Sequence, residues 1–320
     1  MAKYRAALPQ LGGDFFMTDG GIETTLIFLD GQDLPHFAAF HLLRTPDGTD
    51  ALRRYFRTYA ELARRFDVGL ILETATWRSS PDWGRRLGYS ADALAEANRQ
   101  SVRLLEEIRG EYETARRPIV ISGCIGPRGD GYIADTAMSP GEAEDYHRGQ
   151  VETFRDTAVD LVSAITMTYA EEAVGIARAA KRANMPVVIS FTVETDGHLP
   201  TGQSLADAIR HVDDATSGYP AYFMINCAHP SHFDRVVHGG EPWTARIRGL
   251  RANASRMSHA ELNEASDLDA GNPAELGRDY ATLKRERLKH LNVMGGCCGT
   301  DHRHVEQIAS ACLPLFRRVT

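Results

Sequence analysis

Three of the five cysteines occur in two short segments whose residue types suit a metal site. Cys297 and Cys298 are adjacent in a Gly-Gly-Cys-Cys-Gly-Thr run (295–300), and Cys227 lies in an Asn-Cys-Ala-His-Pro run (226–230). Successive side chains on an extended strand point to opposite faces, so two adjacent cysteines are poorly suited to filling one core. The flanking glycines would let the backbone leave the extended conformation and turn both sulfurs toward one centre.

Three thiolates around one centre predict a catalytic zinc site. Zinc bound by three protein ligands keeps a fourth position open for a substrate, as catalytic zinc sites do. Structural zinc is usually marked by Cys-x-x-Cys pairs, which the sequence lacks. Three alternatives remain open on the residues alone: a vicinal disulfide, buried inert thiols, or a structural zinc site completed by His229 or His302.

The composition is that of a globular chain. Of 320 residues, 43% are hydrophobic and 25% are charged, which is enough apolar surface for a sizeable core. The net charge of −7 disfavours nucleic acid as a partner, because phosphate binding needs a basic face. An odd number of cysteines fits metal or catalytic use in a reducing compartment better than a disulfide framework. The N-terminus has no apolar signal segment and no run reaches membrane-spanning length, so we expect a cytoplasmic protein without a membrane partner.

Eight apolar runs of strand length alternate with segments of helical length. Near-continuous apolar runs are typical of parallel strands that are covered on both faces. Helix starts are indicated by Ser90, by Ser139-Pro140 and by Asn272-Pro273. The alternation predicts one (β/α)8 barrel domain over residues 1–320, with a doubly wound open sheet as the alternative. The predicted strands are 15–19, 68–76, 118–125, 161–168, 186–193, 221–227, 246–252 and 291–296.

A barrel of this kind carries its functional residues at the C-terminal ends of its strands. Strands six and eight are not neighbours, yet they flank one mouth, so one metal ion could reach all three sulfurs. Two predicted loops, 126–139 and 252–272, are long enough to be functional lids, although either could be a plain surface excursion. The notable strand-end residues are Asp19, Thr76, Trp77, Cys227, Cys297 and Cys298.

These motifs resemble those of the homocysteine S-methyltransferase family, which includes betaine-dependent enzymes and the homocysteine-binding module of cobalamin-dependent methionine synthase. The resemblance rests on Asp-Gly-Gly at 19–21, Asn-Cys at 226–227 and the run at 295–300, and it extends over nearly the whole chain. It implies a (β/α)8 barrel in which zinc binds the thiol of homocysteine. The zinc ligands that it implies are Cys227, Cys297 and Cys298, whereas we expect Cys124 and Cys312 to be buried structural thiols.

The activity that the resemblance implies is S-methyl transfer from an onium-type or similar donor to a zinc-bound thiol, giving methionine when homocysteine accepts. A free thiol is mostly protonated at neutral pH, and coordination to zinc removes that proton. The partners would be a small-molecule thiol acceptor and a methyl donor, and an oligomer is compatible with the sequence.

Four further residues are expected at the substrates. The resemblance implies that Asp19 is a catalytic and substrate-binding residue, although a turn aspartate before two glycines is the alternative. We expect Thr76, Trp77 and Thr166 to contact substrate. Trp77, together with Trp83, could face a cationic donor through cation–π attraction, but either ring could instead serve packing.

One position departs from the family pattern. Relatives end strand four with a glutamate that binds the amino group of homocysteine, and here Ile165 occupies that place. Loss of one charged hydrogen bond costs on the order of 1.5 to 3 kcal/mol. We therefore expect either a substitute carboxylate, Glu73 or Glu194, or an acceptor thiol without an α-amino group. A zinc-binding or thiol-redox protein without methyl transfer is the alternative from another class.

Overall fold

Eight parallel strands close into one barrel in chain order in the computed structural model, which describes residues 1–134, 137–265 and 267–316. The first strand pairs with both the second and the eighth, so the open-sheet alternative is wrong and the (β/α)8 prediction is confirmed. The strands are β1 (Phe16–Met17), β2 (Gly69–Glu73), β3 (Ile119–Ile125), β4 (Leu161–Met167), β5 (Val187–Phe191), β6 (Tyr222–Asn226), β7 (Ile247–Ala252) and β8 (Val293–Gly296).

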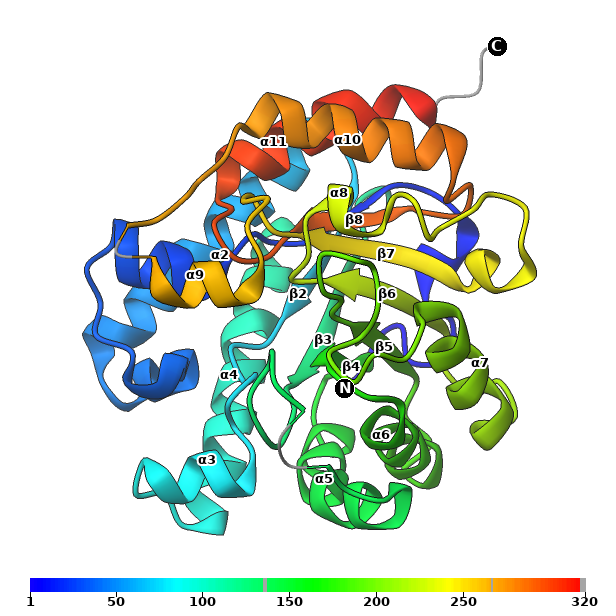
Figure 1. Cartoon of the computed structure of the whole chain (residues 1–320). Helices are drawn as coiled ribbons and strands as arrows, with labels where there is room; N and C mark the ends of the chain where they lie inside the picture. Colours follow the sequence, from blue (N-terminus) through cyan, green and yellow to red (C-terminus); the bar gives the residue numbers. More distant parts are fainter. Residues whose placement is uncertain (135–136, 266, 317–320) are drawn as a thin grey trace.

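Helices surround the strands, as Figure 1 shows. The three helix starts read from the sequence are confirmed: Ser90 and Ser139 accept backbone N–H bonds at the starts of α4 and α5, and Asn272 does so at α10. The helices are α1 (Ile22–Thr24), α2 (Pro46–Phe66), α3 (Pro81–Arg86), α4 (Ala91–Tyr112), α5 (Pro140–Arg155), α6 (Ala170–Arg182), α7 (Leu205–Thr216), α8 (Pro230–Phe233), α9 (His259–Glu264), α10 (Pro273–Glu286) and α11 (His302–Cys312).

The interior of the barrel is divided into an apolar floor and a polar layer above it. The floor is one buried cluster with members from seven of the strands, including Phe16, Ile71 and Val120. Side chains two positions along a strand share a face. On β2, β3, β4 and β5 the positions two residues beyond the floor are polar, and β7 adds Arg251 to the same layer; the residues are Glu73, Ser122, Ser163, Ser190 and Arg251, all buried. The outward positions pack with the helices in the main core.

The two long loops follow β3 and β7, at the C-terminal ends of the strands. The loop 252–272 contains the short helix α9, which the sequence analysis did not predict. Positions 135, 136 and 266 of these loops lie outside the described residues, as do 317–320 of the predicted domain.

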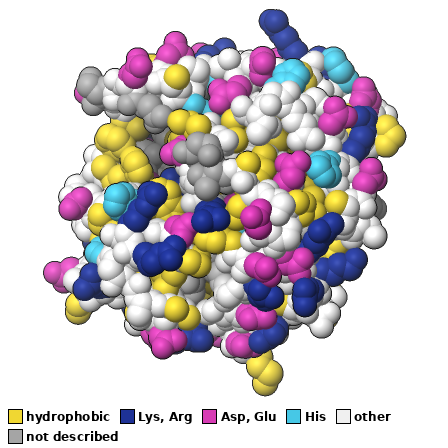
Figure 2. All heavy atoms as spheres, turned by 60° about the horizontal axis from the view of Figure 1, so that its bottom comes forward, with side chains coloured by type: hydrophobic (Ala, Val, Ile, Leu, Met, Phe, Trp, Pro, Cys, Tyr) yellow, Lys and Arg dark blue, Asp and Glu magenta, His cyan; other side chains and the backbone are white. Residues whose placement is uncertain are grey.

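Charged side chains of both signs are interspersed on the face seen in Figure 2. Many form surface ion pairs, such as Arg57 of α2 with Glu111 of α4. In the described ranges, no helix combines the length and apolar character that crossing a membrane would need.

Candidate metal centre and substrate cavity

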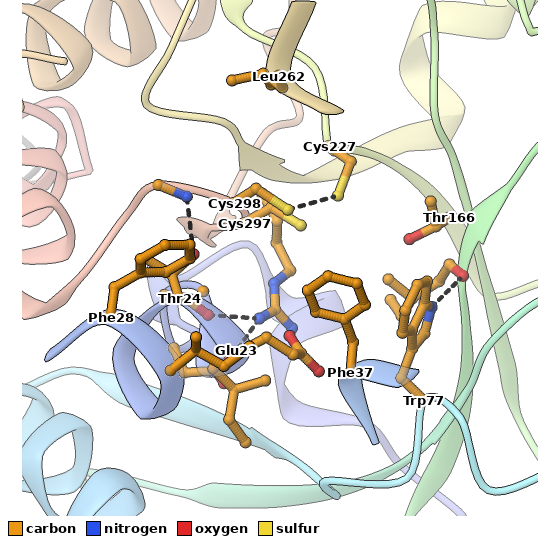
Figure 3. A pocket seen from close by; sticks show the side chains of 18 of the residues that line it. Glu23, Thr24, Phe28, Phe37, Trp77, Thr166, Cys227, Leu262, Cys297 and Cys298 are labelled. Atoms are coloured by element: carbon orange, nitrogen blue, oxygen red, sulfur yellow. Dashed lines mark hydrogen bonds and ion pairs between the residues drawn. The ribbon is translucent and has the colours of Figure 1, made fainter. Parts of the chain in front are cut away.

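The structure brings the three predicted cysteines together at the mouth of the barrel. The Sγ atoms of Cys227, Cys297 and Cys298 all lie within 4.8 Å of one another, and those of Cys227 and Cys298 are 3.8 Å apart. In Figure 3 the three sulfurs point toward one another. Four sulfurs arranged tetrahedrally about zinc, with bonds of about 2.3 Å, would be roughly 3.8 Å apart. The Sγ atoms of Cys227, Cys297 and Cys298, called the sulfur group below, therefore fit a zinc ion held by three ligands.

The side chain of Asn226 stabilises unusual backbone conformations at two residues near the sulfur group. Thr166 and Cys227 have φ angles of +66° and +54°, which non-glycine residues rarely adopt. The Asn226 side chain accepts from the Thr166 amide at 2.9 Å and from the Ser190 hydroxyl at 2.6 Å, and it donates to the Thr166 hydroxyl at 2.8 Å. It thereby ties the end of β6 to β4 and β5, which fixes the direction in which Cys227 leaves its strand.

The glycines of the 295–300 run let segments of the chain pack closely and let the backbone leave the extended conformation, as Gly299 does at a φ of +76°. A Cβ on Gly295 would lie 1.9 Å from the Thr18 hydroxyl, and one on Gly296 would lie 2.1 Å from the Thr300 hydroxyl. They allow β8 to lie against β1 and the following turn to fold back, and this fold-back carries Cys297 and Cys298 to the mouth.

Asp19 forms a buried ion pair that sequence reasoning did not foresee. Its Oδ1 lies 2.5 Å from Nη2 of Arg251, and Tyr55 donates to its Oδ2 at 2.8 Å. Burial raises the pKa of the Asp19 carboxyl, whereas the charge of Arg251 and the bond from Tyr55 lower it. Nε of Arg251 also donates to the carbonyl of Gly296 at 3.1 Å, directly before Cys297. The pair thus braces the turn that carries two of the sulfurs.

A cavity of about 310 Å³ opens beside the sulfur group. Its volume suits a molecule of amino-acid size. Both long loops contribute to its wall, through Tyr132 from the first and Leu262 from the second, so the functional interpretation of these loops is favoured over a plain surface excursion. Figure 3 shows Phe28, Phe37 and Trp77 around the same space.

Two further carboxylates line this cavity in addition to Asp19, namely the half-buried Glu23 and the buried Glu73. Burial raises the pKa of Glu23 to about 7 and that of Glu73 to about 7. Glu73 is only 5% exposed, and its Oε2 has no hydrogen-bond partner among the described residues. Such a group is a candidate for binding a cation.

The predicted substrate residues are only partly gathered at the cavity. Asp19, Trp77 and Thr166 line it, but Thr76 does not. The Thr76 hydroxyl donates to the carbonyl of Cys124 at 2.7 Å and lies 2.6 Å from the Thr74 hydroxyl. The side chain is thus used within the protein, and the expected contact of Thr76 with substrate is corrected.

The two tryptophans already have a cation between them in the protein. The guanidinium of Arg78 lies 3.9 Å from the ring centroid of Trp77 and 4.0 Å from that of Trp83. Trp83 does not line the cavity, and Arg86 also lies against its ring. The expectation that both rings face a cationic donor is therefore wrong for Trp83. Arg78 itself lines the cavity, and its Nε has no partner in the described part of the chain.

Tyr132 is a further cavity residue to which the sequence assigned no role. Its hydroxyl lies 3.2 Å from Sγ of Cys298 and 3.8 Å from Sγ of Cys227, and its ring lies 4.3 Å from that of His259. The glycine-rich segment 126–131 directly before it was the available signal.

The other two cysteines are buried, as predicted. Cys312 is fully buried in the main core, and Cys124 is 6% exposed and lines the cavity. Burial raises the pKa of the Cys124 thiol, which keeps it protonated. Of the two proposed substitute carboxylates, Glu73 lines the cavity, whereas Glu194 does not and instead lies 3.3 Å from His259.

Several known proteins resemble this chain in sequence or in fold. The family model for homocysteine S-methyltransferase matches residues 16–312. Homocysteine S-methyltransferase YbgG of Bacillus subtilis (strain 168) is 26% identical over 247 residues, which cover 70% of this chain and 74% of that protein. The oxidised form of the homocysteine methyltransferase MmuM from Escherichia coli has a TM-score of 0.73 at 19% identity and covers 96% of this chain and 99% of its own. Its metallated form has a TM-score of 0.70 at 18% identity and covers 94% and 97%. At these identities the solved structures show the fold.

Proposed function

Because the chain belongs to the homocysteine S-methyltransferase family, we propose that it moves a methyl group from an onium-type donor to the thiol of homocysteine, giving methionine, at a zinc ion held by Cys227, Cys297 and Cys298. Family membership makes the chain a methyltransferase that acts on a homocysteine-like thiol. The observation that carries the finer proposal is the group of three sulfurs, which lies at the wall of an amino-acid-sized cavity.

The donor set supports zinc rather than a harder cation. Three thiolates suit zinc, whereas magnesium and calcium prefer oxygen ligands. When bound, zinc would lower the pKa of an acceptor thiol so that it attacks as the thiolate.

The chain's own residues orient the reactants. Asp19 and Arg251 are proposed to act as positioning residues, since their ion pair braces the turn that bears Cys297 and Cys298. On the other side of the mouth, the hydrogen bonds of Asn226 to Thr166 fix the strand end that carries Cys227. The loops that carry Tyr132 and Leu262 cover the cavity and reduce the access of water to the reacting sulfur.

The cavity wall also supports a charged donor. Glu23 and the rings of Phe28 and Phe37 line the cavity, and such groups favour a sulfonium or quaternary ammonium ion. Arg78 offers an unused guanidinium N–H, which suits a substrate carboxylate. We therefore propose that Arg78 binds the carboxylate of one substrate.

A matrix of methyl donors and thiols tests the proposal. Zinc-loaded protein is incubated with sulfonium, quaternary ammonium and methylfolate donors against homocysteine, cysteine and γ-mercaptobutyrate, and the products are identified by mass. We expect methionine with an onium donor. Zinc binding without methylation of any thiol would contradict the proposed reaction and favour a zinc-binding or thiol-redox protein.

A further inference from the structure

Glu73 is a buried carboxylate in the cavity wall that has no ion-pair partner of its own among the described residues, because Arg251, the cation that acts on it, is paired with Asp19. Within the described part of the chain it has no ion pair, and its Oε2 has no hydrogen-bond partner. It faces inward from the last residue of β2, opposite Ser122 in the strand register. A buried carboxylate is costly unless it is protonated or meets a cation. The position is therefore arranged for a cation that the cavity receives from outside.

Glu73 lies in the polar layer of the barrel, where its surroundings suit a cation that donates hydrogen bonds. The hydroxyls of Ser122 and Ser163 lie 2.7 Å from each other, and both serines lower the pKa of the Glu73 carboxyl, which means that they favour its charged form. The apolar floor that includes Ile71 and Val120 lies one inward position below. Water therefore has little access from beneath, and the open side of the carboxylate is the cavity.

The other acidic side chains at the cavity are less suited to this role. Asp19 already pairs with Arg251, the guanidinium of the polar layer. Asp130 accepts from the amide of Tyr132 at 2.8 Å. Glu23 is half-buried, whereas Glu73 is 5% exposed, although burial raises the pKa of both to about 7.

The neighbouring inward position on β4 offers nothing to a cation. Ile165 follows Ser163 by two residues, lines the cavity and is 6% exposed. An ammonium group that entered this part of the cavity would meet an apolar wall at β4 and a carboxylate at β2.

We propose that Glu73 binds the α-ammonium group of the acceptor, so that this chain selects an amino-acid thiol over the same thiol acid without the amino group. The inference rests on the proposed function only in that the sulfur group takes up the acceptor's thiol. The thiol would then be held at the strand ends of β6 and β8, and the ammonium at the strand end of β2.

Equilibrium binding tests this assignment without requiring turnover. Zinc-loaded protein is titrated by calorimetry with homocysteine and with γ-mercaptobutyrate, in the absence of any methyl donor. Glu73→Gln keeps the shape of the side chain and removes its charge. We expect this variant to bind homocysteine about 10-fold or more weakly, because a charged hydrogen bond is lost, and to bind γ-mercaptobutyrate within about 3-fold of the original protein.

Two further variants make the result specific to position 73. Glu23→Gln is the matched control, since it removes another cavity carboxylate with a similarly raised pKa, and the preference for homocysteine should remain. Ile165→Glu added to Glu73→Gln returns a carboxylate to the cavity from β4, and the preference should recover at least in part. Thermal unfolding of each variant identifies any that has lost its fold. Glu73→Asp keeps the charge but has a shorter reach, so it should lose less affinity for homocysteine than Glu73→Gln does.

An unchanged ratio of the two affinities in Glu73→Gln would overturn the inference, as would a loss of preference in Glu23→Gln instead. Failure of the proposed function looks different, because both thiols would then bind with the expected preference while no methylated product formed.

Discussion

Arg251 at the end of β7 and Asp19 after β1 form a buried ion pair across the barrel mouth, with Nη2 and Oδ1 2.5 Å apart. The two side chains are 8% and 4% exposed, so neither charge is well solvated. The same guanidinium holds the carbonyl of Gly296, the residue before Cys297. The pair therefore links the first strand to the turn that carries two of the three proposed metal ligands.

Removal of one partner of this pair should be strongly destabilising. Asp19→Asn keeps the shape of the side chain but leaves the charge of Arg251 buried, which should cost about 3 kcal/mol of unfolding free energy. The double variant Asp19→Asn/Arg251→Gln should lose less than the sum of the single variants, because no unpaired charge remains. Urea unfolding measures all three. Glu111→Gln, which breaks an exposed ion pair with Arg57, is the control and should unfold like the original protein. Additive losses in the double variant would show that the two charges do not interact.

Glu73 should lower the stability of the protein above neutral pH. Its folded pKa of about 7 lies above the ordinary value of 4.5, so the folded state holds the proton more tightly than the unfolded chain does. The corresponding stability is present below about pH 4.5 and is lost as the pH rises through 7. Glu73→Gln should therefore be more stable than the original protein at pH 8, by about 1 to 3 kcal/mol, with the difference shrinking toward pH 5.

Thermal or urea unfolding over this pH range checks the prediction. Arg251 and Asp19 are the charged groups that act on Glu73, and both are present in the two proteins compared. A difference in stability that does not vary between pH 5 and 8 would show that Glu73 does not titrate there.

The fold could be predicted from the sequence because each barrel strand is covered on both faces. Such strands appear as continuous apolar runs, and all eight were identified, including β7 with its two arginines. Arg246 falls just before β7 and pairs with Asp213, whereas Arg251 turns inward to Asp19. The apolar pattern located the strand, but it could not show which arginine forms an ion pair with Asp213 and which one turns into the barrel.

The sulfur group was predictable for a similar reason, since it follows the ends of two strands that flank one mouth. The residues that line the substrate cavity were harder to predict from the sequence. β2 ends at Glu73, three residues before the predicted end at Thr76, so the in-and-out alternation of the strand no longer applies there. Glu73 was named from the sequence as a possible substitute carboxylate, and it lies two residues after Ile71, on the same inward face of the strand. Tyr132 comes from a loop, whose path over the mouth depends on tertiary packing.

Asn226 should be needed for the metal site rather than only for stability. Asn226→Ala removes the bonds that hold Thr166 and the β6 end, so the strained backbone at Cys227 should relax and zinc affinity should fall at least 10-fold. Asn98→Ala is the matched control, since Asn98 is equally buried and hydrogen-bonded but lies in α4. Competition with a chromogenic chelator measures zinc affinity. Equal zinc affinity in both variants would show that Asn226 does not position the site.

Oxidation should inactivate the protein reversibly. The Sγ atoms of Cys227 and Cys298 are 3.8 Å apart, so small side-chain rotations would bring them to bonding distance once zinc is lost. We expect peroxide to release zinc and to produce a Cys227–Cys298 disulfide in peptide maps, and reductant plus zinc should restore activity. Cys312→Ser should behave like the original protein, because Cys312 is buried in the main core. Activity that persists after complete chelation of zinc would contradict a metal mechanism.

We propose that the three-sulfur group binds the metal at which a thiol is methylated. Metal content and methyl transfer, measured together, test this proposal. Zinc content and the rate of methionine formation from homocysteine and an onium donor are measured on the same samples of the original protein, Cys298→Ser and Cys124→Ser. We expect about one zinc per chain and methionine formation in the original protein and in Cys124→Ser, whose sulfur lies outside the group. We expect loss of both in Cys298→Ser. Unchanged zinc content and unchanged methionine formation in Cys298→Ser would contradict this proposal.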